Sequence, residues 1–338
     1  MNSHERAIGV VAREETISLD APSAWRAALR GVPHAFGHTW ESCYAMHLST
    51  GYHTYLYTFE LGEIRICCPI AERVFEGHVD VVTPYGFSGF VGNQAYPYFD
   101  SHWKQFAKRR GYICGYIGLN PLLCDTTYYE QSEAYAYNQL FALDLTLDLD
   151  KLFGRLSTNR RRQVRAAQNT TKFVFDRDRL LGFVLEHYLD FFRSKKASEI
   201  YHFSPETLTQ LGKSENVILS GVEGEEGIEA VTVLAFTPYV GEYFLNISLP
   251  TGQRHAAALL WHGVQQLKAK RVAWFNLGGG IRPDDGVAQF KQRFGGQVFP
   301  LLSLKQVYAQ DLFKTLCRQA KADPNHLSGY FPPYRAKS

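Results

Sequence analysis

The order of predicted elements repeats on either side of a basic segment in the middle of the chain. Between residues 155 and 172 the sequence has six Arg or Lys residues and no Asp or Glu. Strand patterns alternate with helix patterns both before and after this segment, with helix patterns over 99–109 and 255–270. The alternation predicts an α/β fold with mixed sheets, built as two tandem units. We expect one unit over 1–150, a second over 151–308, and a tail over 309–338 that packs back on the body.

Composition removes several classes of protein. With 338 residues, 45% hydrophobic and 20% charged, the chain resembles a globular protein and not a disordered segment or a disulfide scaffold. The net charge of +3 does not favour a nucleic-acid coat protein, so no DNA partner is expected. The first sixteen residues carry charges from Glu5 onward, and no run of about 18 apolar residues occurs. We therefore predict a cytoplasmic protein with reduced thiols and no transmembrane segment, for which peripheral membrane contact stays open.

A glycine cluster followed by a Phe-Lys helix is the strongest local signal. A strand pattern ends in Gly278-Gly-Gly280, an acidic loop follows, and a helix pattern then presents Phe290-Lys-Gln-Arg-Phe294. Glycine permits backbone conformations and close approaches that a Cβ would block. The Leu and Asp or Thr alternation over 143–149 predicts a further strand with one wet face.

These motifs resemble those of the Fem-type aminoacyl and acyl transferases. The resemblance extends to Asp80-Val-Val-Thr-Pro-Tyr-Gly-Phe-Ser-Gly89, to the basic helix Ser157–Ala167, and to the tail Gly329-Tyr-Phe-Pro-Pro-Tyr-Arg335. It implies a pair of GNAT (N-acetyltransferase) domains. It also implies transfer of an acyl or aminoacyl group to an amine, with acyl-coenzyme A or aminoacyl-tRNA as donor substrate and no tightly bound cofactor.

The resemblance also suggests which residues form the site. Lys291 is expected to provide a positive charge near the oxyanion, and Asp284 or Asp285 to accept a proton. Because Lys291 is offset from the side of Phe290 and Phe294 by about 100°, we expect it to point along the rim of a cleft. The remaining candidates are Tyr85, Gly86 and Phe290 for the acceptor, and Gly278, Gly279 and Gly280 for the donor.

Two further stretches bear on phosphate binding. Arg161 and Arg165 lie one turn apart on the predicted basic helix, where two guanidiniums can grip a phosphate. A solvated basic face is the alternative. A coenzyme A pyrophosphate loop would fall at Gln253 and Arg254, but the place of its first glycine holds alanine, so this donor site departs from the GNAT pattern.

The predicted acceptor is a phosphorylated cell-envelope or surface-polysaccharide precursor, such as an amino sugar nucleotide. Two alternatives stay open: a tRNA-dependent transferase acting on a peptidoglycan stem, and a non-catalytic binding subunit of a polysaccharide assembly system. No metal site is expected, because His34 and His38 have Gly37 between them and no acidic partner nearby.

Overall fold

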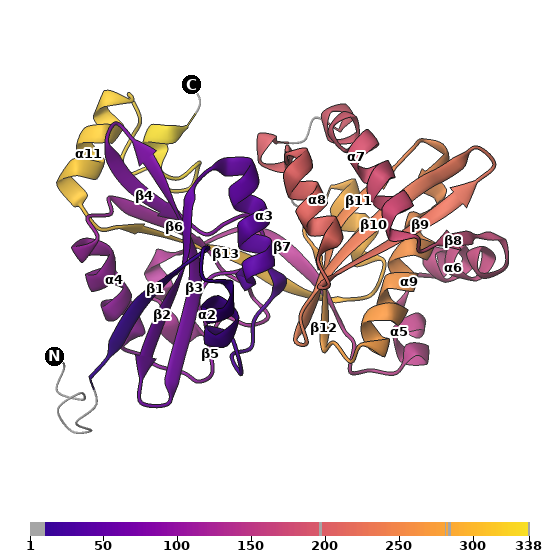
Figure 1. Ribbon diagram of the computed structural model, residues 1–338, viewed down its shortest axis with the longest axis horizontal. Coiled ribbons are helices and arrows are strands. Elements are labelled where there is room, and N and C mark those ends of the chain that lie inside the picture. The colour runs from indigo at the N-terminus through magenta and orange to yellow at the C-terminus, as the bar shows by residue number, and fades with distance from the viewer. Residues whose placement is uncertain (1–10, 196–197, 281, 283–284, 337–338) are drawn as a thin grey trace. The chain divides into compact units, whose positions relative to one another are not determined.

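The computed structural model describes residues 11–195, 198–280, 282 and 285–336. It contains two compact units, one formed by Met1–Tyr137 with Leu301–Ser338 (unit 1) and the other by Asn138–Pro300 (unit 2) (Figure 1). These limits differ from the predicted boundaries at 150 and 308. The reason is that two long strands each leave one unit and enter the other: β7 (Ala134–Asp144) and β13 (Gln297–Val307).

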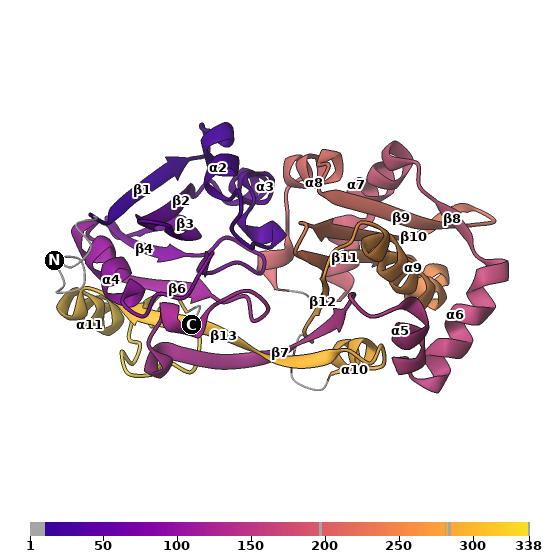
Figure 2. The same cartoon turned by 90° about the horizontal axis from the view of Figure 1, so that it is seen from below.

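Unit 1 is a mixed sheet with helices on both faces. Its strand order is β1-β2-β3-β4-β6-β13, and every pair is antiparallel except the parallel β4 and β6. Figure 2 shows these strands stacked beside one another. The strands are β1 (Arg13–Ser18), β2 (His53–Leu61), β3 (Ile64–Phe75), β4 (His78–Val82), the short β5 (Val91–Gly92) and β6 (Cys114–Gly118).

The core of unit 1 follows the period of two in strand β2. Tyr57 and Phe59 pack against Trp103 of α4 (Phe99–Arg109), whereas Leu56 packs against Trp25 of α2 (Pro22–Ala28) on the other face. Helix α3 (Trp40–Thr50) lies on the same side as α2. Alternate residues of one strand therefore hold helices on opposite faces.

The C-terminal residues complete unit 1. Helix α11 (Gln310–Gln319) and the segment that follows it pack on strands β3 and β6 through Phe313, Phe331 and Tyr334. The buried Asp80 carboxylate anchors this segment, because it accepts hydrogen bonds from Tyr334 Oη at 2.9 Å and Arg335 Nε at 2.7 Å. Arg73 Nε donates to the same carboxylate at 2.7 Å.

Unit 2 repeats the architecture. Its strand order is β7-β12-β11-β10-β9-β8, again antiparallel apart from one parallel pair, β11 and β12. Leu234 of β10 packs against α9, and its neighbour Val233 faces α7 and α8. The helices are α5 (Leu149–Arg155), α6 (Thr158–Thr170), α7 (Arg177–Ser194), α8 (Pro205–Lys213), α9 (Ala256–Ala269) and α10 (Gly286–Gln292). The strands not yet given are β8 (Lys172–Val174), β9 (Val217–Gly224), β10 (Gly227–Phe236), β11 (Val240–Ser248) and β12 (Trp274–Gly278).

The predicted strand over 143–149 is wrong. Strand β7 ends at Asp144, whose carboxylate accepts from the backbone N of Thr146 at 3.0 Å and from its hydroxyl at 2.6 Å, forming a turn. Asp148 then caps α5 by accepting from Lys151 N at 2.7 Å. The Asp residues that suggested a wet strand face are turn and cap residues.

Candidate active site

The three glycines after β12 are required by close packing. Gly278 has a φ of +72°, which L side chains rarely adopt. A Cβ on Gly279 would lie 2.2 Å from Gln139 O, and one on Gly280 would lie 2.5 Å from Asp285 Oδ1. The backbone of this cluster thus lies against strand β7 and the start of α10, and Asn138 Nδ2 donates to Gly280 O at 2.7 Å. Binding of a donor by these glycines stays a prediction.

Lys291 is buried and bonded to the glycine cluster. Its side chain is 8% exposed, and Nζ donates to Gly279 O at 2.6 Å. Burial lowers the pKa of Lys291 to about 8, and the negative charge of Asp285 only partly opposes this shift. The expectation that Lys291 points along an exposed rim is wrong, because helix α10 packs this side of its surface against the glycine loop.

The two acidic candidates differ. Asp285 caps α10: its Oδ1 accepts from Ala288 N at 2.8 Å and its Oδ2 from Arg282 N at 3.0 Å. These bonds give Asp285 a structural role at the entrance to the helix that carries Lys291. Asp284 lies outside the described residues.

A buried carboxylate and amide lie beside the cluster. Glu242 of β11 and Asn276 of β12 are direct neighbours across the parallel pair and are 2% and 1% exposed. Asn276 Oδ1 accepts from Gly278 N at 2.7 Å, whereas its Nδ2 has no hydrogen-bond partner among the described residues. Sequence reasoning missed both residues. The available signal was a Glu and an Asn within otherwise apolar strand patterns, where burial of a polar group demands a reason.

Arg160 and Phe290 stack at the other side of α10. The Arg160 guanidinium lies 4.3 Å from the centre of the half-buried Phe290 ring and 5.7 Å from that of Phe294. The predicted acceptor residue Phe290 is therefore covered on one face by an arginine. Phe290 and Phe294 also contact one another, with ring centres 5.4 Å apart.

The side chains of Arg161 and Arg165, predicted to bind a phosphate, contact other protein groups instead. Arg161 Nη1 donates to the carbonyls of Gly154 at 2.8 Å and Leu156 at 2.9 Å, and its Nη2 donates to Thr158 Oγ1. Arg165 lies 5.2 Å from the ring centre of Phe153. Arg161 thus satisfies carbonyls at the end of α5, a role that the helical spacing alone does not reveal.

The predicted pyrophosphate loop is a closed turn. Gln253 and Arg254 belong to the 3₁₀ turn Thr251–His255, which runs directly into α9. A Cβ on Gly252 would lie 2.2 Å from Glu229 O, and the Glu229 carboxylate lies 3.4 Å from Arg254 Nη2 and 3.6 Å from His255 Nε2. The Glu229 carboxylate therefore lies close to the turn in which a bound pyrophosphate would need positive charge.

Tyr85 and Gly86 belong to unit 1, in the loop after β4. Gly86 has a φ of +129°, and Tyr85 is half-buried. The loop is fixed by Asn120 Nδ2, which donates to Phe87 O at 3.1 Å, and by His38 Nε2, which lies 3.1 Å from Gly89 O. Burial and the neighbouring His34 lower the pKa of His38 to about 3, so the ring is neutral and serves as a packing group. These two contacts to the backbone hold the loop in place.

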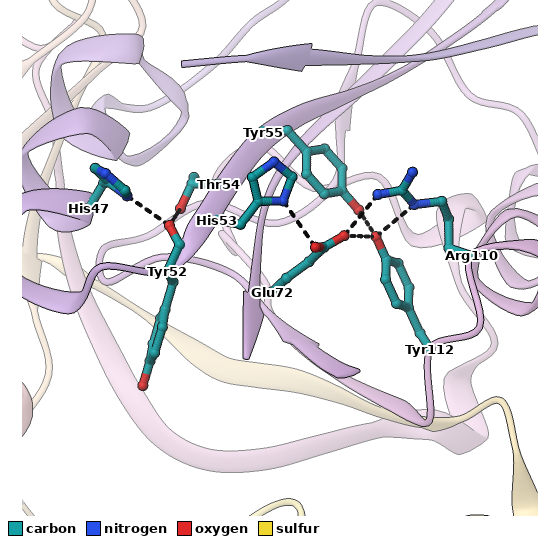
Figure 3. Close-up of polar contacts among 8 residues, drawn as sticks. All are labelled: His47, Tyr52, His53, Thr54, Tyr55, Glu72, Arg110 and Tyr112. Carbon is teal, nitrogen blue, oxygen red and sulfur yellow. Dashed lines mark hydrogen bonds and ion pairs between the residues drawn. The ribbon is translucent and has the colours of Figure 1, made fainter. Parts of the chain in front are cut away.

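A second polar cluster in unit 1 has all its charges paired (Figure 3). The Glu72 carboxylate accepts from Arg110 Nη2 at 3.0 Å and from the Tyr112 hydroxyl, and it lies 2.9 Å from His53 Nδ1. The Tyr55 and Tyr112 hydroxyl oxygens are 2.6 Å apart. Burial opposes ionisation of Glu72, but the hydrogen bonds from Tyr112, Arg110 and His53 outweigh it and lower the pKa of the carboxyl. The cluster joins the end of α4 to strands β2 and β3.

The described residues offer neither a metal centre nor a membrane-spanning helix. The described part of the chain contains no group of three or more His, Cys, Asp or Glu side chains arranged to hold a metal ion. Within the same residues, every helix is too short or too polar to cross a bilayer.

Comparison with solved structures identifies the fold. The crystal structure of FemX matches 90% of this chain and 99% of its own, with a TM-score of 0.67 and 11% sequence identity. L-PGS from Bacillus licheniformis matches 88% of this chain and 94% of its own, with a TM-score of 0.56 and 15% identity. The C-terminal domain of a putative lysylphosphatidylglycerol synthetase from Agrobacterium fabrum gives a TM-score of 0.54 at 13% identity, covering 88% of this chain and 96% of that domain. Comparison of the sequence with protein-family models and with curated proteins finds no match. The predicted Fem-type α/β fold with two GNAT-like units is confirmed at the level of the fold.

Proposed function

We propose that the chain is an N-acyltransferase of the Fem type, which moves an acyl or aminoacyl group onto an amine of a cell-envelope or surface-polysaccharide precursor. The observation that carries the proposal is the buried Lys291, with a pKa of about 8 and its Nζ on Gly279 O, within the fold shared with FemX. A desolvated lysine beside a glycine cluster is costly to fold, which argues for a role in chemistry. The fold by itself does not specify a reaction.

The residues of unit 2 supply the two charges that acyl transfer needs. A neutral amine attacks the carbonyl carbon of an ester or thioester, so a C–N bond forms and negative charge develops on the carbonyl oxygen. With a pKa of about 8, Lys291 is roughly nine tenths protonated at pH 7, and its ammonium can stabilise that oxyanion. Collapse breaks the C–O or C–S bond to the leaving group.

The proton lost by the amine needs an acceptor. We assign this role to Glu242, because it is buried and is the register neighbour of Asn276, whose Oδ1 accepts from the backbone N of Gly278. The proton then passes to the departing oxygen or sulfur. Glu242→Gln should lower the rate more than Asp285→Asn lowers it once corrected for folding; the reverse result, or a larger loss in Asp284→Asn, would return the role to the sequence-based candidates.

The start of α9 bears on the donor. Its closed 3₁₀ turn and the Glu229 carboxylate oppose a pyrophosphate at Gln253 and Arg254. This supports an aminoacyl ester, as in aminoacyl-tRNA, over acyl-coenzyme A as the donor. The acceptor would be a phosphorylated precursor such as an amino sugar nucleotide.

Two measurements test the proposal together. Transfer to amino sugar nucleotides and to peptidoglycan stem precursors is assayed with charged tRNA and with acyl-coenzyme A, and melting is followed with coenzyme A present. RNase-sensitive transfer without a coenzyme A shift supports the aminoacyl-ester donor. A coenzyme A shift of several degrees with RNase-resistant transfer would reverse the choice of donor. Tight binding of a precursor without turnover from either donor would instead indicate a non-catalytic subunit.

A further inference from the structure

The arginines around the start of α6 lack carboxylate partners. Among the described residues, no ion pair joins Asp or Glu to any arginine of this group, although Lys172 and Arg179 nearby both pair with Glu223. The group is held together by backbone contacts: Ser157 N donates to Arg293 O at 2.9 Å, and a Cβ on Gly295 would lie 2.2 Å from Arg155 O. Its members are Arg155, Arg160, Arg161, Arg162, Arg165 and Arg293.

Arg160 is the buried member of the group. It is 8% exposed, its Nη1 donates to Gln163 Oε1 at 2.6 Å, and its buried Nε has no hydrogen-bond partner among the described residues. Burial and the positive charge of Arg293 lower the pKa of Arg160, while the nearby Tyr243 opposes the shift. A buried guanidinium with only neutral partners is costly, and the cost falls when an anion binds.

The aromatic contacts hold Arg160 in place, but they supply no negative charge to pair with its guanidinium. The Arg160 guanidinium lies over the ring of Phe290 and near that of Phe294, and such cation–π contacts stabilise a desolvated cation. A second arginine within electrostatic reach destabilises the same cation. Arg160 therefore combines burial, an Nε without a hydrogen-bond partner and a nearby arginine, with no carboxylate paired to it among the described residues, and this combination suits an anion.

We infer that Arg160 and Arg293, at the start of α6 and the end of α10, form a binding site for a phosphate ester of the substrate. The inference deepens the proposed function and rests on it for the identity of the substrate. A phosphate fits better than a single carboxylate, because the surrounding arginines are in excess and a phosphate ester can carry two charges and several acceptor oxygens. The phosphate could come from a nucleotide diphosphate sugar or from an RNA backbone, which share this chemistry.

The test compares two arginines of one helix. Arg160→Met keeps an apolar chain against the ring of Phe290, and Arg162→Met removes the same charge from an exposed position, where Nη2 donates to Asn159 Oδ1. Binding of inorganic pyrophosphate, UDP-N-acetylglucosamine and a single-stranded RNA ending in CCA is measured on the full chain, without donor or turnover. The Arg160 Nε–H signal is followed by ¹⁵N NMR in the unsubstituted protein. Arg160→Lys, which keeps the charge but lacks Nε, replaces the methionine variant if that variant does not fold.

The expected result is a shift of the Arg160 Nε–H signal with pyrophosphate. For whichever phosphate source binds best, affinity should fall at least tenfold in Arg160→Met and less than threefold in Arg162→Met. Preference for UDP-N-acetylglucosamine or for RNA identifies the source. Equal losses in the two variants would show a diffuse basic surface, and no binding of any probe would show a purely structural cation; either overturns the inference. Loss of binding in Arg160→Met without any detectable transfer would keep the site and reject the proposed function.

Discussion

The two units share a topology but differ in how they treat buried charge. In each, a helix joins the two strands of the single parallel pair, α4 between β4 and β6 in unit 1, and α9 between β11 and β12 in unit 2. In unit 1 the half-buried Lys104 Nζ lies 2.7 Å from both Asp100 and Glu133. In unit 2 the buried Lys291 bonds to a carbonyl.

Paired charges in unit 1 have a structural role. Paired charges hold elements together: Asp80 fixes the C-terminal segment, and Glu72 fixes the end of α4. Charges with only neutral partners cost folding free energy. Unit 2 has such a charge at Lys291, and unit 1 has one at Lys305, whose Nζ donates to Gly329 O at 2.9 Å. The two lysines differ in what they contact: Lys305 bonds to carbonyls of the C-terminal segment, whereas Lys291 bonds to the glycine cluster of the candidate site.

The largest expected effect tests the structural role of paired charges in unit 1, at Asp80. Asp80→Asn leaves the Arg73 and Arg335 guanidiniums buried without a counter-charge and should lower the free energy of unfolding by about 3 to 5 kcal/mol. Urea unfolding measures this loss. A loss below about 1 kcal/mol would mean that the buried ion pairs of unit 1 are not the structural anchors described here.

The titration of Lys291 gives a second large effect. Its pKa is about 8 in the folded protein and 10.5 when unperturbed, so between these values the unfolded chain binds more protons than the native one. Stability must therefore rise with pH from about 8 to 10.5, by about 3 kcal/mol from this group. The difference in unfolding free energy between the unsubstituted protein and Lys291→Met isolates the contribution. If this difference in unfolding free energy did not change between pH 8 and 10.5, Lys291 would be exposed to water in the folded protein.

The same substitution should separate chemistry from folding. Lys291→Met should lower turnover on the order of a hundredfold, about 2.7 kcal/mol, because an oxyanion partner is lost. At pH 7 it should cost no more than about 1 kcal/mol of stability, since removing a desolvated cation offsets the hydrogen bond lost to Gly279.

Lys104→Met is the matched control in unit 1. There we expect full turnover and a stability loss of about 2 kcal/mol, because Asp100 and Glu133 lose their hydrogen-bonded cation. Near-normal turnover in Lys291→Met, or a matching loss in Lys104→Met, would remove the functional distinction between the units.

The smallest expected effect is a difference in stability between variants of two neighbouring arginines in unit 2. Arg161→Ala should lower the free energy of unfolding by about 1 to 2 kcal/mol, because the carbonyls of Gly154 and Leu156 lose their donor. Arg162→Ala, at an exposed position, should stay within about 0.5 kcal/mol. Thermal melts of both variants check this. Equal stabilities would mean that Arg161 is as available to a ligand as its neighbour.

Much of the secondary structure follows from local pattern. The helix over 99–109 and the helix close to 255–270 both occur as expected. The wrong prediction of a strand over 143–149 has a local cause: the side chains of Asp144 and Asp148 end one element and begin the next. A period of two cannot distinguish such residues from the wet face of a strand.

The sequence by itself determined the α/β class, the basic helix and the glycine cluster followed by Lys291, because these depend on residue type and spacing over a few turns. Only the tertiary structure decided which charges are neutralised. Arg160 and Arg161 are adjacent in one basic run, yet one is stacked under Phe290 from α10 and the other bonds to carbonyls at the end of α5. Glu242 and Asn276 become neighbours only through the pairing of β11 with β12. Burial and hydrogen-bond partners come from segments distant in the chain, and these set the pKa and the energetic cost of each charge, which local spacing cannot provide.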